Sequence, residues 1–220
     1  MLTANLINTN IPRLKPQDSL AKALQLISDF KVTHLPVVSD GKFLGLICEE
    51  DLLDVEEQKV TIEVLQEFLI QAAVDENAHF LIAVNCSIQF DTNVVPVISQ
   101  SGEYIGVITT TDLLKALANF SGANEIGGII VLEMERSQFA ISEISRIVES
   151  NDCTILHLNT TVHPESGMLT VTIHINKREI STVIATFERY DYHVSYNFGV
   201  ENFENEIDNN YRNFMHYLDI

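Results

Sequence analysis

An internal repeat of about sixty residues constrains this chain more than any other feature. The segment "HLPVVSDGKFLGLICEEDLLDV", residues 34–55, returns as "VVPVISQSGEYIGVITTTDLLKAL", residues 94–117. Identical residues fall on each other at an offset of sixty, and at sixty-one after one extra residue in the second hairpin: Ala23 and Ala83, Phe30 and Phe90, Pro36 and Pro96, Gly45 and Gly106, Asp51 and Asp112. The first half of the chain therefore consists of two copies of one structural unit.

Each copy has the same order of predicted elements. "SLAKALQLISDF" places Leu20, Ala23 and Ile27 on one face of a helix behind a capping Ser19. Two short apolar runs joined by a glycine turn then predict a hairpin of buried strands, and an acid-rich segment predicts a short helix. In the second copy "IQAAV" is the expected leading strand, and Asp75 or Asn77 is the expected helix cap. One copy reads as β-α-β-β-α.

The two copies resemble a tandem pair of CBS domains, the family named after cystathionine beta-synthase. The second copy carries the family's motif Gly-x-hydrophobic-hydrophobic-Gly-hydrophobic-hydrophobic-Thr-x-x-Asp at residues 102–112. The resemblance covers residues 1–120, with repeats at about 1–58 and 60–120. It implies an α+β fold in which the two repeats pack through their sheets and leave two related clefts that bind adenosine-type ligands such as AMP, ATP or S-adenosylmethionine.

The resemblance also implies which residues contact a ligand. The motif's Thr and Asp, which bind ribose and phosphate in the family, fall on Thr109 and Asp112 in the second copy and on Asp51 in the first. Cys48 stands where the first copy should have Thr, and because a thiol is a weak donor we expect that cleft to be empty or apolar. Thr109 and Asp112 also fit a helix capping box, which needs no ligand.

Two basic residues precede the first helix and are candidate phosphate contacts, Arg13 and Lys15. No P-loop pattern occurs, and the first half has few cations, so a monophosphate or an uncharged adenosine group is easier to accommodate than a triphosphate. The alternative is that Arg13 and Lys15 are ordinary solvated surface residues. No metal site is predicted.

The second half has a different pattern, after a polar, glycine-rich linker at 121–128. Alternating strands and amphipathic helices follow in the order βαββαβ, with Ser137 as the expected cap of the first helix. This order resembles the ferredoxin-like ACT domain, here over residues 129–200. Since "ERSQFA" lacks the glycine of the family's Asp-x-x-Gly turn, the resemblance implies a dimerising or packing role in preference to an amino-acid site.

Period-two alternation in the second half sends Leu156, Leu158 and Val171 to the helix side of the sheet and places His157 opposite His174 on the other side. Such a histidine pair suits metal binding or pH sensing, but no third ligand is visible in the sequence. The last segment, residues 202–220, has an apolar stripe typical of an amphipathic C-terminal helix that packs on its own chain or on a second subunit.

Charge and composition exclude several classes of partner. The formal net charge is −18, which repels nucleic acid and anionic membrane surfaces. The N-terminus does not have the pattern of a secretory signal, and no apolar run is long enough to span a bilayer, so we expect a cytoplasmic protein. Cys48, Cys86 and Cys153 are too few and too scattered for a disulfide framework and are expected to be reduced.

Two functions remain open from the sequence. The first is a regulatory sensor whose CBS pair binds an adenosine-type ligand and whose ACT-like domain mediates dimerisation or coupling. The alternative is a ligand-free interaction or scaffold homodimer, which Cys48 and the missing glycine favour. An enzyme is not predicted, because no histidine and acid stand in a recognisable relation to a cysteine. A homodimer is expected in either case; the protein partner and any cofactor stay unidentified.

Overall fold

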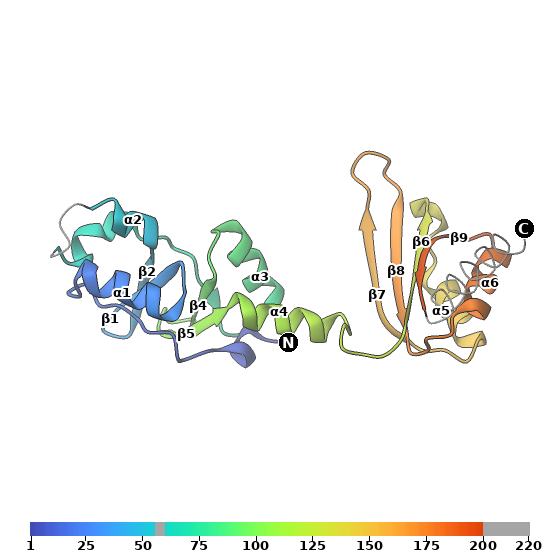
Figure 1. The fold of residues 1–220 in the computed structure, drawn as a ribbon, viewed down its shortest axis with the longest axis horizontal. Coiled ribbons are helices and arrows are strands. Elements are labelled where there is room, and N and C mark those ends of the chain that lie inside the picture. Colours follow the sequence, from blue (N-terminus) through green and yellow to red (C-terminus); the bar gives the residue numbers. More distant parts are fainter. Residues whose placement is uncertain (56–59, 200–220) are drawn as a thin grey trace, which may run out of the picture. The chain divides into compact units, whose positions relative to one another are not determined.

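The computed structural model describes residues 1–55 and 60–199, and its contacts divide the chain into two compact units, Met1–Leu117 and Ala118–Ile220 (Figure 1). Helix α4, Thr110–Phe120, crosses this division, and strand β6 begins at Gly128. The domain limits expected from the sequence, at 120, 128 and 200, stay predictions. The expected C-terminal helix at 202–220 lies outside the described residues.

The described part of the first unit contains two hairpins, four α-helices and two 3-10 helices. The first repeat comprises η1 Thr3–Leu6, α1 Leu20–Phe30, β1 His34–Ser39, β2 Lys42–Cys48 and α2 Glu49–Leu53. The second comprises η2 Ile62–Phe68, β3 Val74–Asp75, α3 Phe80–Gln89, β4 Val94–Ile98, β5 Tyr104–Thr109 and α4. Each hairpin is antiparallel, and the turn of each is made by a glycine at positive φ, Gly41 or Gly102.

The helices of the repeat form for the reasons the sequence indicates. The Ser19 hydroxyl accepts a hydrogen bond from the Lys22 backbone N–H at 3.3 Å, which confirms it as the cap of α1. Leu20, Ala23 and Ile27 are buried on the predicted face. The expected cap of α3 is wrong: its N-cap is His79, and Asp75 instead accepts from the backbone N–H of Asn77, closing a turn before the helix.

The leading strands are shorter than predicted, because each leading segment divides its pairing between the two repeats. In the second repeat only Val74–Asp75 is a strand, parallel to β4, while Ile70 exchanges backbone hydrogen bonds with Leu46 of the first repeat. In the first repeat Leu14 forms a single parallel bridge to Val37 of β1, and Asn8 exchanges bonds with Val107 of the second repeat. The leading segments therefore cross over, and each repeat supplies backbone to the other's hairpin.

One apolar core joins the two repeats. Its fully buried members come from both copies and include Leu20, Leu35, Leu46 and Ile47 of the first and Val94, Val97, Val107 and Ile108 of the second. Neither hairpin is large enough to be stable alone, since two strands expose too much apolar surface. The repeat is thus a requirement of the core, as the sequence predicts.

Up to residue 199 the second unit is a four-stranded antiparallel sheet with two α-helices. Its elements are β6 Gly128–Met134, η3 Arg136–Gln138, α5 Ile141–Ser150, β7 Ile155–Val162, β8 Leu169–Ile175, α6 Ser181–Arg189 and β9 His193–Phe198. The strand order across the sheet is β7-β8-β6-β9. Both helices lie on one face, where alternate residues of β6 and β8 are buried (Figure 1). The order of elements along the chain is βαββαβ.

Two local predictions for this unit are wrong. Ser137 does not cap the following helix: it lies in η3 and its hydroxyl donates to Glu135, while α5 begins four residues later behind Ala140. Leu156 is 38% exposed, because a bulge between Ile155 and His157 shifts the register and turns Ile155 to the core instead. A single bulge of this kind cannot be recognised from an alternating sequence.

Candidate functional site

The second repeat's motif residues gather at the start of α4, and we call Asn8, Thr109 and Asp112 the Thr109 cluster. The Thr109 hydroxyl donates to the Asp112 carboxylate at 2.6 Å and accepts from the Asp112 backbone N–H at 3.2 Å. The Asn8 side-chain amide approaches the same carboxylate oxygen at 3.5 Å. All three side chains are half-buried. The structure therefore brings together the two principal residues predicted from the motif, and adds Asn8.

This geometry contains the capping interaction that the sequence offered as an alternative. One hydroxyl both caps α4 and holds the Asp112 carboxylate in place, so the acid is oriented before any ligand arrives. The second carboxylate oxygen of Asp112 has no bond among those of the described residues. A carboxylate beside a carboxamide and a helix N-terminus suits a diol with an attached phosphate.

The two predicted cations lie elsewhere. The Arg13 guanidinium lies over the ring of Tyr104, 5.9 Å from its centroid, at the opposite end of β5 from Thr109. Burial raises the pKa of Tyr104 to about 12, with Arg13 opposing the shift. The backbone N–H of Lys15 donates to the Asp18 carboxylate at 2.8 Å. Among the contacts of residues 1–55 and 60–199, none joins Arg13 or Lys15 to the Thr109 cluster.

The first repeat's motif residues line a cavity of about 380 Å³, which we call the Cys48 cavity. Cys48 and Asp51 are both in its wall, so the structure brings these two predicted residues together. Its other lining residues are Thr33, His34, Glu49, Glu50, Ile70, Phe90 and Asp91. Four carboxylates face this space, which contradicts the expectation of an apolar cleft. The sequence did not reveal this because Ile70, Phe90 and Asp91 come from the other repeat.

His34 is the one imidazole in the wall of the Cys48 cavity. Its residue surface is 4% exposed, and its Nδ1 lies 2.8 Å from the Thr33 hydroxyl. Burial lowers the pKa of His34, while Asp51, Asp91 and Glu50 act in the opposite direction. At neutral pH the ring is therefore uncharged and does not offset the carboxylates.

The three cysteines are far apart in the sequence, and two of them are buried. All three are free thiols, as expected. Burial raises the pKa of Cys86 and of Cys153, which keeps both protonated at neutral pH. Within the described residues, no group of three or more His, Cys, Asp or Glu side chains is arranged to hold a metal ion.

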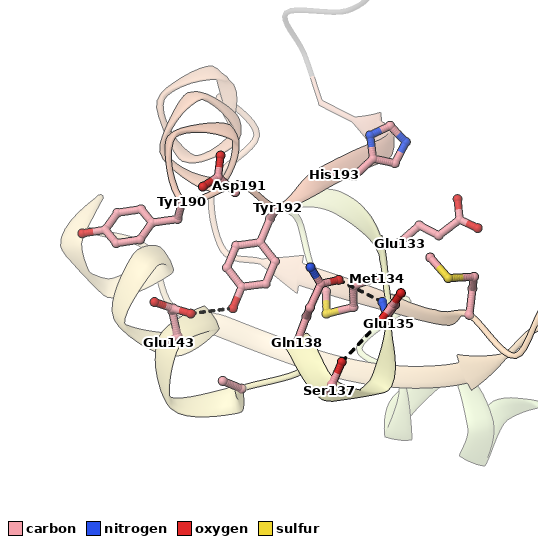
Figure 2. A pocket seen from close by; sticks show the side chains of 12 residues that line it. Glu133, Met134, Glu135, Ser137, Gln138, Glu143, Tyr190, Asp191, Tyr192 and His193 are labelled. Atoms are coloured by element: carbon pink, nitrogen blue, oxygen red, sulfur yellow. Dashed lines mark hydrogen bonds between the residues drawn. The ribbon is translucent and has the colours of Figure 1, made fainter.

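The second unit contains a larger cavity, of about 720 Å³, which sequence reasoning missed (Figure 2). It lies at the turn from β6 to α5, where the ACT resemblance places an amino-acid site. Its wall contains four carboxylates, from Glu133, Glu135, Glu143 and Asp191. The η3 turn at this site is stabilised by a hydrogen bond from the Glu135 backbone N–H to the Gln138 side-chain oxygen, at 3.0 Å. A ligand with a free carboxylate would be repelled by this wall.

Tyr192 links the two sides of that cavity. Its hydroxyl donates to the Glu143 carboxylate at 2.9 Å, as Figure 2 shows. Burial raises the pKa of Tyr192 to about 12, and the neighbouring Glu143 adds to the shift. The phenol therefore stays a donor at any physiological pH and ties the residue before β9 to α5.

The predicted histidine pair is present on the sheet. His157 and His174 are directly paired between β7 and β8, and the Phe120 ring meets the His157 ring edge-on at 5.9 Å. Cβ atoms built on Gly122 and Gly127 would each come close to the His174 ring. The chain before β6 thus approaches both rings, which makes a packing role the better explanation of the pair.

No helix of the described chain is long and apolar enough to cross a membrane.

Comparison with known proteins finds a match to one domain family within the first unit. A model of the CBS domain family matches residues 4–57 and 72–119. A crystal structure of a CBS domain pair/ACT domain protein from Thermotoga maritima superposes with a TM-score of 0.51 at 19% identity, over 55% of this chain and 98% of that one. This likeness shows a shared fold.

Two curated relatives are similar over parts of their length. Homoserine O-acetyltransferase of Methanococcus vannielii is 24% identical over 123 residues, which are 53% of this chain and 25% of the enzyme. An uncharacterised protein of Methanocaldococcus jannaschii is 33% identical over 64 residues, 29% of this chain and 34% of that protein. The chain therefore spans only about a quarter to a third of the length of these curated relatives.

Proposed function

We propose that this is a cytoplasmic regulatory protein that senses an adenosine-type ligand, because residues 4–57 and 72–119 match a model of the CBS domain family. The ligand binds at the Thr109 cluster, and the second unit passes its effect on through dimer geometry or a partner. In this proposal the chain has no catalytic activity of its own.

One observation carries the proposal. The Asp112 carboxylate is held by the Thr109 hydroxyl at 2.6 Å, with one oxygen still available for donors of a ligand. A ribose offers two hydroxyl donors to such an oxygen, and the N-terminus of α4 favours the phosphate that follows. Asn8 adds a donor from the other repeat. A side chain that only capped the helix would not need this third partner.

The second unit supports a dimer in this proposal. Its strand order β7-β8-β6-β9 and its βαββαβ succession agree with an ACT-like domain. The Thermotoga maritima protein is described as a CBS domain pair with an ACT domain, which is the combination proposed here. The acidic lining of the cavity at the β6–α5 turn disfavours an amino acid there, so assembly is the role that we assign to this unit.

A second candidate is a scaffold homodimer that binds no small molecule. The observation that favours it is that Thr109 and Asp112 already satisfy each other as a helix cap. The four carboxylates of the Cys48 cavity favour it too, since they leave at most one site for a phosphate-bearing ligand. A ligand-binding measurement separates the two candidates.

We expect thermal unfolding to reveal the ligand. The purified chain is heated with AMP, ADP, ATP, S-adenosylmethionine or NADH, beside the variants Asp112→Ala and Asp51→Ala. A ligand at one hundred times its dissociation constant stabilises the folded state by about 2.7 kcal/mol. This stabilisation should persist in Asp51→Ala, the repeat-related control, and vanish in Asp112→Ala.

The Asp112 variant also loses part of a helix cap, which costs about 1 kcal/mol without any ligand. The quantity compared is therefore the ligand-induced shift within each variant, and not the absolute unfolding temperature. Asp112→Asn, which keeps the size of the side chain, serves as a second variant. A flat response of the wild type to all five compounds would favour the scaffold.

The assembly state is a separate expected result. Light scattering on the purified chain should return a mass near twice the 24.7 kDa of one chain. The mass should not depend on added nucleotide, because the dimer contact is assigned to the second unit. A mass of one chain at micromolar concentration would contradict the dimer and leave the ligand proposal unaffected.

A further inference from the structure

The two repeats differ in charge at equivalent positions near their motif residues. We propose that this asymmetry confines a phosphate-bearing ligand to the Thr109 cluster, and that Lys31 is the residue that selects the phosphate. The inference rests on the proposed function and adds to it the chemical class of the ligand, the number of occupied sites and a residue that the motif does not contain.

An approximate two-fold symmetry relates the repeats. Thr33 and Asn93 occupy equivalent positions and bond to each other: the Thr33 backbone N–H donates to the Asn93 side-chain oxygen at 2.9 Å. The N–H of Glu49 donates to the Thr33 carbonyl, and the N–H of Thr110 donates to the Asn93 carbonyl in the same way. The symmetry therefore assigns each lining residue of the Cys48 cavity a counterpart around the Thr109 cluster.

Lys31 is the counterpart of Asp91. Both residues follow the first helix of their repeat and both have a left-handed backbone, with φ of 54° and 46°. Asp91 lines the Cys48 cavity. The Asn93 side-chain amide donates to the Lys31 carbonyl at 3.1 Å, and the Asn93 carbonyl accepts from Thr110 in the first turn of α4. Two hydrogen bonds thus connect the Lys31 backbone to the helix start that holds Asp112.

The other counterparts strengthen the contrast. In the first repeat the three residues after the motif cysteine are Glu49, Glu50 and Asp51; in the second, those after Thr109 are two threonines and Asp112. The Cys48 cavity has four carboxylates and no Lys or Arg in its wall. The equivalent positions around the Thr109 cluster carry one carboxylate and one lysine.

This difference decides where an anion binds. Four carboxylates around about 380 Å³ repel a doubly charged phosphate, and the neutral His34 does not compensate. At the position equivalent to Asp91 the second repeat has Lys31 instead, and in this proposal its long flexible stem with three donors offsets the single negative charge of Asp112. An uncharged adenosine lacks the phosphate and should gain nothing from Lys31.

The test measures the affinity of AMP and of adenosine by isothermal titration calorimetry on the full chain. The variants are Lys31→Gln and its repeat-related control Asp91→Asn, each of which removes one charge from a polar, exposed residue. We expect one AMP per chain for the wild type. Lys31→Gln should weaken AMP about tenfold, the effect of one charge-assisted hydrogen bond at a partly exposed site, and change adenosine less than about twofold. Asp91→Asn should leave AMP within about twofold.

The outcomes separate this inference from the function on which it rests. Equal losses for AMP and adenosine, or no loss for AMP, in Lys31→Gln would overturn the role of Lys31 while binding itself stands. Two AMP per chain, or tighter AMP binding in Asp91→Asn, would overturn confinement to one site. No binding of either compound to the wild type would overturn the proposed function, and the inference with it.

Discussion

Replacement of Phe187 by alanine is expected to lower the free energy of unfolding of the second unit by about 3–5 kcal/mol. Phe187 lies on α6, is fully buried, and is the largest fully buried side chain of this unit's core. Its ring meets Tyr192 edge-on at 5.7 Å, so the substitution also removes an aromatic pair. The cavity left behind cannot collapse fully, because α6 is held on the sheet by its other contacts.

Hydrogen exchange of the β6 and β8 backbone amides measures this effect, since a chain of two units need not unfold in one step. The control is Ile141→Ala, an apolar residue at the start of α5 that is 57% exposed and should change stability by less than about 0.5 kcal/mol. A loss below about 1 kcal/mol in Phe187→Ala would mean that the core of this unit is not packed as described.

Replacement of Gly45 by alanine should destabilise the first unit by about 3 kcal/mol. Gly45 has φ of 154°, and an added Cβ would lie 2.7 Å from the Cβ of Leu69 and 3.1 Å from the Ile70 carbonyl oxygen. Those residues belong to the leading segment that crosses from the second repeat and exchanges backbone bonds with Leu46. The substitution combines backbone strain with overpacking at this crossing, each of which costs about 1–3 kcal/mol.

The matched control is Gly41→Ala. Gly41 also has a positive φ, of 80°, but an added Cβ would meet no atom within 4 Å. It should therefore cost only the conformational penalty of about 1–2 kcal/mol. Urea denaturation followed by circular dichroism gives both values. If Gly45→Ala cost no more than Gly41→Ala, the crossing of the leading segments would be in doubt.

Features encoded in contiguous residues could be predicted from the sequence. The repeat, its hairpins and the cap at Ser19 depend on neighbours within a few positions, and so does the pairing of Thr109 with Asp112 three residues later. The order βαββαβ of the second half was expected too, because its alternating or apolar runs are bounded by glycine and polar residues. The pattern of residues close together in the sequence was sufficient to predict these features.

Features that depend on contacts between repeats could not be predicted in this way. Asn8 reaches Asp112 across 104 residues of sequence, and only the crossing of the leading segments brings it there. The acidic Cys48 cavity arises because Asp91 of the second repeat faces Glu49, Glu50 and Asp51 of the first. The sequence around the motif showed the three acids after Cys48, but not that Asp91 of the other repeat joins them in one cavity.

Arg13 and Lys15 show how an expectation based on sequence position compares with the structure. Their position before the first helix suggested a phosphate site, since a cleft was expected to open there. In the structure the Arg13 guanidinium packs on the face of the Tyr104 ring, which is a favourable cation–π contact. The cation that the repeat symmetry brings to the motif is instead Lys31, at the end of the first helix.

The central claim is that the Thr109 cluster binds an adenosine-type ligand, and the most direct test is a nuclear magnetic resonance titration of the isotope-labelled chain with AMP. The account predicts saturable shifts that concentrate on the amides of Asn8, Lys31, Thr109 and Asp112, with those of Cys48 and Asp51 unchanged. Saturable shifts centred on the Cys48 cavity or on the second unit, or no shifts at millimolar AMP, would contradict it.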